Sequence, residues 1–280
     1  MSQFAIAGLQ LALKNQDNSF IVASEIEKAK QRFPWLNMVV VGELACFGPN
    51  PANALPVPNK TEAMFCELAK KHGIWIIPGS MFELDDGKVY NTMPVISPDG
   101  EVVCRYRKIY PFYPYEAGVE TGSEFVVFDV PNIGRFGLSI CYDMWFPETT
   151  RELVSLGAEV IIHPTMTNTL DRDLELSIAR TNAAVNQCYF FDVNCAGDLG
   201  NGLSTVVSPE GRVLHTAGEN SEVIAVEIDL STVRRTRERG LMGLGQPLKS
   251  FRDNTIEYSV YSHQQGTFDE LGPLDLPTSK

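Results

Sequence analysis

Short runs of β-branched residues alternate along this chain with amphipathic segments of helical period, and this alternation limits the fold more than any other feature. The predicted strands cover residues 3–10, 38–42, 74–79, 136–140 and 158–164. The predicted helices cover residues 24–33, 60–72 and 148–156. Strands that alternate with helices are typical of α/β folds. The sequence therefore predicts an α/β protein.

Two segments in different halves of the chain share one hairpin pattern. Residues 95–103 read VISPDGEVV, and residues 206–214 read VVSPEGRVL. The shared Ser-Pro-acid-Gly centre is a strong turn signal. Each segment follows a helix and a strand, which suggests a pseudo-repeat of helix–strand–strand units that builds two facing sheets. The alternative is that this centre is simply a common hairpin turn.

The chain shows no internal division into domains. No linker, low-complexity stretch or charge block interrupts it, so a single domain is predicted over residues 1–262. The last segment, residues 263–280, is rich in proline, glycine and acidic residues. This composition favours an extended C-terminal tail over a packed element. An arm of this kind can reach a neighbouring subunit.

The acidic balance of the chain excludes two classes of partner. Its 280 residues include 23 Lys and Arg against 35 Asp and Glu, a formal charge of −12. Nucleic-acid phosphates require a basic face, and an anionic membrane surface would repel this chain. No apolar run reaches the roughly 18–20 residues of a membrane span, and the N-terminus lacks the basic start of a signal peptide. The predicted location is the cytoplasm.

The cysteines and histidines indicate neither a disulfide framework nor a metal site. The six cysteines, at positions 46, 66, 104, 141, 188 and 195, have no paired CxxC spacing. Most are expected to be buried thiols, and one is a candidate nucleophile. The four histidines show no ligand spacing, so no metal and no cofactor are predicted.

Three predicted strands end in residues that can carry chemistry, namely Glu43, Cys141 and His163. Ligands of α/β proteins lie in the crevice above the carboxyl ends of the strands. The predicted helix after Cys141 begins near Pro147. A nearby helix N-terminus would favour a thiolate and, later, an oxyanion.

A thiol needs a base, because at a pKa near ~8.5 only a few per cent of it is ionised at neutral pH. A carboxylate in a partly dry pocket has a raised pKa and is a competent base, which suits Glu43. Lys108 follows a predicted hairpin strand and precedes aromatic and proline residues that would wall a pocket. Its charge would stabilise an oxyanion. His163 offers an alternative Cys–His pair, but no partner Asn or Asp is evident for it.

Three segments together resemble the signatures of the carbon–nitrogen hydrolase (nitrilase-like) superfamily, in its amidase and N-carbamoyl amidohydrolase branch. They are VVVGELACFGP around Glu43, RYRKIYPFYPYE around Lys108 and GLSICYDMWFPE around Cys141. They occur in the family's order, and the resemblance extends from the first strand to about residue 253. It implies a single-domain, four-layer αββα sandwich that forms a homodimer or a higher homo-oligomer. It also implies hydrolysis through a Cys thioester without a metal.

The resemblance assigns roles to individual residues of this chain. Cys141 would be the nucleophile and Glu43 the general base and later the acid. Lys108 would stabilise the oxyanion together with the backbone N–H of Tyr142. Glu116, eight positions after Lys108, matches a second glutamate of the family. It would position the amine side of the substrate or the attacking water.

The residues after Cys141 bear on the substrate. True nitrilases typically continue with Trp-Glu-Asn, whereas this chain has Tyr-Asp-Met, which argues for an amide or ureido substrate. Sequences similar to ω-amidases carry an arginine where this chain has Trp145. Its loss puts recognition of a carboxylate-bearing amide in doubt, although Arg172 or Arg180 could supply the charge. The Trp-Phe-Pro-Glu segment is instead similar to N-carbamoylputrescine amidases, whose substrate is cationic.

The leading interpretation is hydrolysis of a carbon–nitrogen bond in a small amide or N-carbamoyl compound, with release of ammonia. The predicted substrate-binding residues are Tyr142, Trp145, Tyr115 and Thr165. One alternative is a nitrilase that converts a nitrile to an acid and ammonia. Another is a non-catalytic binding member of the same fold, against which the intact Glu43–Lys108–Cys141 set speaks.

Overall fold

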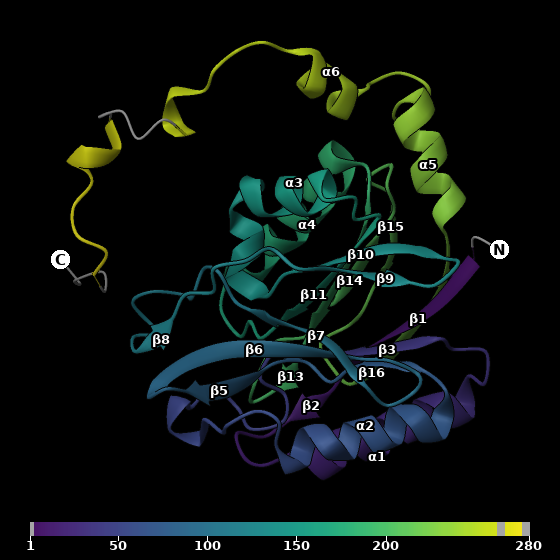
Figure 1. The fold of residues 1–280 in the computed structure, drawn as a ribbon, viewed down its shortest axis with the longest axis vertical. Coiled ribbons are helices and arrows are strands. Elements are labelled where there is room, and N and C mark those ends of the chain that lie inside the picture. The colour runs from purple at the N-terminus through teal and green to yellow at the C-terminus, as the bar shows by residue number, and fades with distance from the viewer. Residues whose placement is uncertain (1–2, 262–266, 276–280) are drawn as a thin grey trace.

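Two facing β-sheets form the centre of the molecule (Figure 1). The computed structural model describes residues 3–261 and 267–275. The strands of the first sheet are β1 Gln3–Gln10, β3 Met38–Val41, β4 Trp75–Ile77, β5 Met81–Asp85, β6 Lys88–Ile96, β7 Val102–Arg107, β8 Val119–Glu120 and β16 Glu222–Asp229. Their order is β16-β1-β3-β4-β6-β5, and β7 and β8 also pair with β6.

The second sheet repeats this plan with fewer strands. Its strands are β9 Val127–Val130, β10 Gly134–Leu138, β11 Val160–Thr165, β12 Tyr189–Asn194, β14 Thr205–Val207 and β15 Val213–Thr216. They follow the order β15-β14-β12-β11-β10-β9, with β10, β11 and β12 parallel. A small ribbon of β2 Ala12–Leu13 and β13 Ala196–Gly197 links the two halves of the chain.

Helices cover the outer face of each sheet. The helices of the described residues are α1 Ser19–Arg32, α2 Lys60–His72, α3 Pro147–Ser155, α4 Arg172–Asn186, α5 Leu230–Arg239 and α6 Pro247–Asp253. The short 3₁₀ segments are η1 Pro51–Asn53, η2 Cys141–Trp145, η3 Ser259–Tyr261 and η4 Thr267–Glu270. Helices α1 and α2 lie against the first sheet, and α3 and α4 lie against the second. The layers are therefore α, β, β, α, as the sequence predicted.

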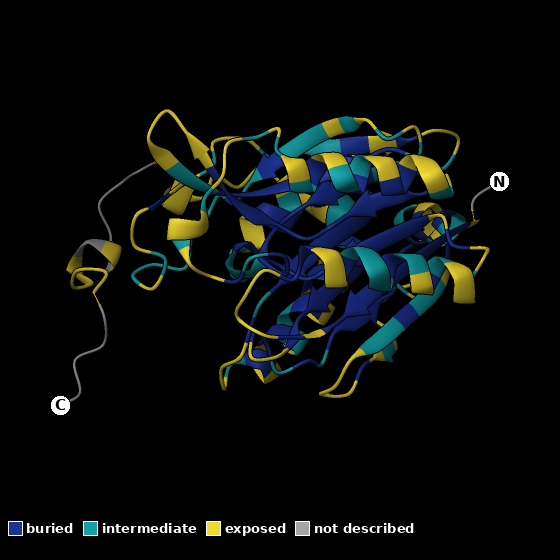
Figure 2. Ribbon diagram, turned by 90° about the horizontal axis from the view of Figure 1, so that it is seen from below, coloured by how far each residue is buried: buried dark blue, intermediate teal, exposed yellow. Residues whose placement is uncertain are grey.

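The core explains why the central strands read as continuous apolar runs. One cluster of buried residues lies between the sheets and includes Ile6, Val40 and Phe136. Alternate residues of the same strands, such as Val39, pack under α1 and α2. All four residues of β3 are buried. Strands that bury both faces form nearly continuous apolar runs rich in Val, Ile and Leu. Figure 2 shows these buried strands between partly exposed helices.

Local signals set the ends of the helices. The Asn59 side chain accepts a hydrogen bond from the backbone N–H of Glu62 at the start of α2, and Gly73 ends it in the left-handed conformation with φ of +60°. These are the bounds that the sequence predicted. Helix α1 begins at Ser19, five residues earlier than predicted. The Asp17 side chain accepts the Ser19 N–H there, which lets the helix start before its charged segment.

The repeated hairpin is confirmed. Strands β6 and β7 flank the first Ser-Pro-acid-Gly turn, and β14 and β15 flank the second. The two hairpins belong to opposite sheets, so the pseudo-repeat corresponds to one unit in each facing sheet.

The chain leaves the sandwich after α5 (Figure 1). Leu248 in α6 still packs against the cluster under α3 and α4. All residues from 254 to 261 are exposed. The departure thus begins earlier than the predicted tail at 263–280, whose proposed boundary lies outside the described residues. Within the described part of the chain, no helix is both long and apolar enough to cross a membrane.

Candidate active site

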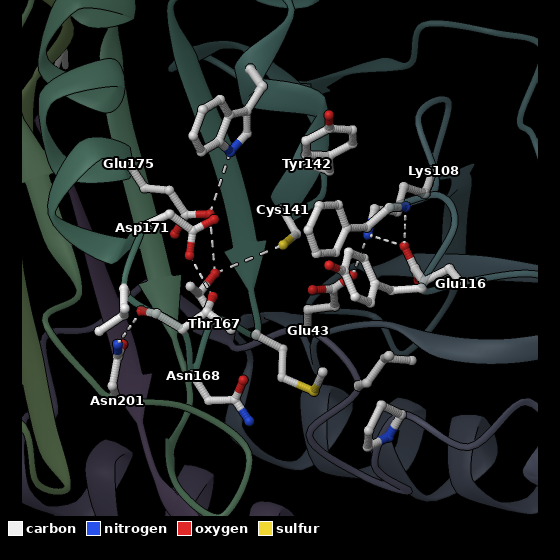
Figure 3. A pocket seen from close by; sticks show the side chains of 18 of the residues that line it. Glu43, Lys108, Glu116, Cys141, Tyr142, Thr167, Asn168, Asp171, Glu175 and Asn201 are labelled. Carbon is white, nitrogen blue, oxygen red and sulfur yellow. Dashed lines mark hydrogen bonds and ion pairs between the residues drawn. The ribbon is translucent and has the colours of Figure 1, made fainter. Parts of the chain in front are cut away.

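The ends of three strands meet at one cavity of about 890 Å³. Glu43 follows β3, Lys108 follows β7, and Cys141 follows β10, and all three line this cavity. Figure 3 shows the Cys141 thiol between a group of charged side chains on one side and Thr167 with Glu175 on the other. Residues that lie almost 100 positions apart in the sequence therefore share one site.

Close contact between the two sheets holds Glu43 in place. Its backbone N–H donates to the carbonyl of Thr165 at 3.1 Å, which joins the ends of β3 and β11. Gly42 precedes it, and a Cβ at this position would lie 2.6 Å from the Sγ of Cys195. Only glycine fits at such a distance, so the sequence Gly42-Glu43 is required by the approach of the two sheets.

Four side chains form a buried polar group beside the thiol. The Lys108 ammonium donates to Glu43 Oε1 at 2.9 Å and to Glu116 Oε2 at 2.7 Å. The Asn91 amide donates to the same Glu43 oxygen at 2.8 Å and approaches Glu116 Oε1 at 3.4 Å. Lys108 and Glu43 are almost fully buried. Each charge is therefore held by two partners from different segments of the chain.

The pKa directions at this group follow from burial and from the paired charges. Burial raises the pKa of Glu43, and the attraction of Lys108 offsets this only in part. Burial alone would lower the pKa of Lys108, but the charges of Glu43, Cys141 and Glu116 raise it well above its ordinary value. Burial also opposes ionisation of Glu116, yet Lys108 lowers its pKa overall. Lys108 is thus a permanent cation, and Glu43 is the stronger base of the two carboxylates.

Cys141 lies on a strained turn. Its φ is +45°, a left-handed conformation that non-glycine residues rarely adopt. Cys141 is the first residue of η2, and α3 begins six residues later at Pro147. Burial and the nearby Glu43 carboxylate raise the pKa of the thiol well above its ordinary value. Burial therefore outweighs the effect of the nearby helix N-terminus, and the group is a thiol that needs a base.

Asp143 holds the turn that carries Cys141. Its Oδ2 accepts the backbone N–H of Ile140 at 2.8 Å and the hydroxyl of Tyr106 at 2.7 Å. Its Oδ1 accepts the backbone N–H of Tyr110 at 2.9 Å. The two segments that carry Cys141 and Lys108 are thereby joined through one fully buried carboxylate.

Asp143→Asn is expected to lower the free energy of unfolding by about 1–3 kcal/mol, because the amide N–H₂ would face a backbone N–H in either of its orientations. Turnover should fall as well, since the Cys141 and Lys108 segments lose their connection. Denaturant unfolding and steady-state kinetics measure the two effects. Asp129→Asn, at an exposed pair with Arg135, is the matched control. Stability equal to that of the control would contradict the positioning role.

The opposite wall of the cavity contains a second buried network. The Thr167 hydroxyl donates to Glu175 Oε1 at 3.1 Å, and the Trp145 indole approaches the same oxygen at 3.5 Å. Arg172 donates to Glu175 Oε2 at 3.0 Å and to Asp192 at 2.6 Å. Arg172 lies behind Glu175, and it is not among the residues that line the cavity.

The predicted substrate-binding residues fall in different places. Tyr142, Trp145 and Tyr115 line the cavity, and Tyr115 is exposed and stacks on Phe112 with ring centroids 4.8 Å apart. Thr165 is fully buried and does not line the cavity, whose wall is formed instead by the residue two positions later. Thr165 is the last residue of β11 and is paired within the sheet, whereas Thr167 lies beyond the end of the strand.

His163 does not form a pair with Cys141 among the interactions that the structure describes. Its Nδ1 lies 2.6 Å from the Ser139 hydroxyl, and its ring packs against Phe190. Burial and the charge of Arg172 lower its pKa well below the ordinary value. The ring is thus a neutral, buried imidazole, and the geometry favours Glu43 over His163 as the base.

Sequence reasoning missed three residues of the site, namely Asn91, Thr167 and Glu175. Asn91 lies in the middle of β6, where nothing in the local sequence distinguishes it from other strand residues. Thr167 and Glu175 lie just after β11 and in the first turn of α4. The position directly after a strand end was the available signal for Thr167.

The other five cysteines lie outside the cavity wall. Cys46, Cys188 and Cys195 are buried, and burial raises the pKa of Cys46 and of Cys188 to about 12. Cys66 and Cys104 are partly exposed, with pKa values that burial also raises. Cys141 alone among the six combines access to the cavity with a neighbouring base.

Comparison with known proteins places this geometry in a family. The carbon-nitrogen hydrolase family model matches residues 5–238. The human protein Omega-amidase NIT2 is 30% identical over 262 residues, which cover 85% of this chain and 93% of that protein. Omega-amidase NIT2-B of Xenopus laevis is 34% identical over 205 residues, covering 68% and 74%.

Solved structures agree with these sequence matches. Nit3 of Saccharomyces cerevisiae, a member of branch 10 of the nitrilase superfamily, is 29% identical with a TM-score of 0.78, and the match covers 85% of this chain and 94% of that one. A carbon-nitrogen hydrolase from Helicobacter pylori G27 is 24% identical, has a TM-score of 0.80 and shares the fold over 94% and 99%. The resemblance seen in the sequence is thereby confirmed: the chain belongs to the carbon-nitrogen hydrolase family and is an enzyme that acts on carbon–nitrogen bonds.

Proposed function

We propose that the protein hydrolyses small amides or N-carbamoyl compounds through a Cys141 thioester and releases ammonia. The observation that carries the proposal is the arrangement of Cys141 in a cavity beside the Glu43–Lys108–Glu116 group. Family relatives named as omega-amidases support an amide substrate. The chain is accordingly an amidohydrolase of linear amides.

The first half-reaction forms the thioester. Glu43 removes the thiol proton as Sγ attacks the carbonyl carbon, so a raised pKa suits its task. The carbonyl oxygen becomes negative and is stabilised by the Lys108 ammonium and the backbone N–H of Tyr142. Glu43 then returns the proton to the nitrogen, the carbon–nitrogen bond breaks, and ammonia leaves.

The second half-reaction releases the acid. Glu43 removes a proton from water, which attacks the thioester carbon, and the thiolate leaves and regains its proton from Glu43. Glu116 accepts hydrogen bonds from Lys108 and from the backbone of Phe112. These contacts hold it ionised and oriented, so it positions the ammonia or the water without taking the proton.

The charges of the cavity wall favour a neutral or cationic substrate. Its acidic side chains are Glu43, Glu116, Asp171 and Glu175, and Lys108 is the only cation among the wall residues that the structure describes. Lys108 is already bonded to two carboxylates. Arg180 donates to the Gly211 carbonyl instead. A carboxylate carried by the substrate would therefore have no unpaired cation to bind among the described wall residues.

Pentanamide should have a kcat/KM about tenfold or more above that of glutaramate, which has the same number of carbon atoms and a terminal carboxylate, because like charges repel at short range. Ammonia release at several salt concentrations measures both values of kcat/KM. Salt should reduce the difference between them, because it screens the repulsion. Faster turnover of glutaramate would show that a cation outside the described wall binds the carboxylate.

Ammonia release from separate pools of primary amides, N-carbamoyl amines and nitriles tests the proposed function. Ammonia from the amide or N-carbamoyl pool supports it. Ammonia from nitriles alone would identify a nitrilase and overturn it. No release from any pool would favour the non-catalytic binding role. Assembly as a homo-oligomer, a cytoplasmic location and the boundary between domain and tail stay predictions.

A further inference from the structure

The side of Cys141 that faces away from Lys108 contains an oriented hydroxyl (Figure 3). The Oγ1 of Thr167 lies 4.0 Å from Cys141 Sγ and 3.2 Å from the Thr165 hydroxyl. The Asn194 side chain accepts the backbone N–H of Thr167 at 2.9 Å and donates to the backbone carbonyl of Thr167 at 3.0 Å. Thr167 and Asn194 are buried, so the hydroxyl has a fixed place.

The direction of the Thr167 hydroxyl follows from its partners. A hydroxyl has one proton to donate, and an ionised carboxylate can only accept. The Thr167 proton therefore points to Glu175 Oε1. Arg172 binds the other oxygen of Glu175 and is itself held by Asp192, which keeps the carboxylate in this orientation. The 3.2 Å contact with the Thr165 hydroxyl is then a hydrogen bond only with Thr165 as the donor, and the Thr165 hydroxyl also lies within hydrogen-bond reach of the Cys141 thiol.

One lone pair of Thr167 consequently faces the thiol. In the free enzyme Sγ lies 4.0 Å from this hydroxyl, while the thiol proton faces Glu43, the proposed base. Once the thioester has formed, Sγ carries no proton, and this acceptor needs a donor from the acyl group. An N-carbamoyl substrate supplies one, because its acyl carbon carries an N–H where a simple amide carries a CH₂.

We propose that Thr167, oriented by Glu175, is a specificity-determining residue that accepts a hydrogen bond from the acyl-side N–H of N-carbamoyl substrates. This inference rests on the proposed function. The R–NH–CO–NH₂ substrate and the Cys141 thiol give R–NH–CO–S–Cys and ammonia. Water then gives the thiol and R–NH–COOH, which loses CO₂ to leave the amine R–NH₂. The products are therefore ammonia, CO₂ and an amine.

The test compares substrates that differ only in this group. Propylurea and pentanamide have the same shape, with NH in one where the other has CH₂, and homologous pairs with shorter and longer chains remove any effect of length. The readout is the ratio of kcat/KM for the urea to that for the amide, from ammonia release. The intrinsic difference in reactivity cancels when variants are compared with wild type.

Thr167→Val is expected to lower this ratio about tenfold, because the valine leaves the acyl N–H without an acceptor. Thr167→Ser, which keeps the hydroxyl, should restore it. Glu175→Gln should lower the ratio as well. Arg172 binds the oxygen of the glutamine amide, so the amide N–H₂ donates to Thr167. The hydroxyl proton of Thr167 then turns toward the substrate and opposes the acyl N–H. Circular dichroism of each variant verifies folding.

The outcomes separate this inference from the proposed function. If Thr167→Val leaves the ratio unchanged within twofold, the role of Thr167 is overturned and amide hydrolysis is not affected. The same conclusion follows if the wild-type enzyme hydrolyses the amides but not the ureas. A ratio in Thr167→Ser as low as that in Thr167→Val would also overturn this role, because the serine keeps the hydroxyl. Absence of ammonia from every pair with the wild-type enzyme overturns the proposed function itself.

Discussion

Cys141→Ala is expected to abolish ammonia release, with a loss of about 10⁴-fold or more in kcat. Alanine removes the atom that forms the thioester, and none of the other five cysteines lines the cavity to replace it. The residual hydrolysis would depend on Lys108 and the backbone N–H of Tyr142 alone. Steady-state ammonia release with the best amide of the panel measures the loss.

A matched control separates loss of the nucleophile from loss of a cysteine. Cys66→Ala changes a partly exposed thiol on α2, on the far side of the first sheet from the cavity. Its turnover should equal that of wild type. If Cys141→Ala retained turnover within tenfold of the control, the thioester pathway would be wrong.

Glu43→Gln is the second large effect, with an expected loss of about 10³-fold in kcat/KM. Glutamine keeps the shape and can still accept from Lys108 and Asn91, but it cannot take a proton from the thiol or from water. Because burial raises the pKa of Cys141, the thiol is protonated at neutral pH and depends on this base. Removal of this proton transfer alone is therefore expected to cause the large loss in kcat/KM.

The pH profile gives a signature of this role. Glu43 acts as a base only when ionised, and burial raises its pKa above the ordinary value of 4.5. The kcat/KM of wild type should therefore fall as the pH is lowered through that raised pKa, and the acid limb should lie above pH 4.5. The residual activity of Glu43→Gln should lack this limb.

Glu62→Gln is the matched control for Glu43→Gln. Glu62 is also a buried carboxylate with a cationic partner, Arg105 at 2.6 Å, but it belongs to α2 and does not line the cavity. Glu62→Gln should lower the free energy of unfolding and leave the acid limb of the kcat/KM profile in place. An acid limb that persists in Glu43→Gln would assign the base to another group, with Glu116 as the next to test.

The sequence predicted the parts of the site that lie in continuous segments. Glu43 and Cys141 each follow a buried strand, and Lys108 follows a hairpin strand, so their place at one edge was foreseeable from the strand pattern. The paired hairpins at 95–103 and 206–214 likewise indicated two facing sheets, which the structure confirms. These features depend on local periodicity and on short turns.

Contacts between distant segments were not foreseeable. Asn91 on β6 binds both carboxylates, and Glu175 on α4 holds Thr167 just beyond the end of β11. Neither residue differs locally from ordinary strand or helix residues. The raised pKa of Cys141 was not foreseeable either, because it depends on burial beside Glu43, which follows a strand of the other sheet.

The sequence by itself determined the layered α/β architecture, the order of the elements and the identity of the Glu43, Lys108 and Cys141 set, because these depend on residues that are neighbours along the chain. Only the tertiary structure decided that the pKa of the thiol is raised, that Lys108 pairs with two carboxylates and in which direction the Thr167 hydroxyl donates. Charge and hydrogen-bond direction depend on the groups within a few ångströms in space, and folding brings those groups from both sheets.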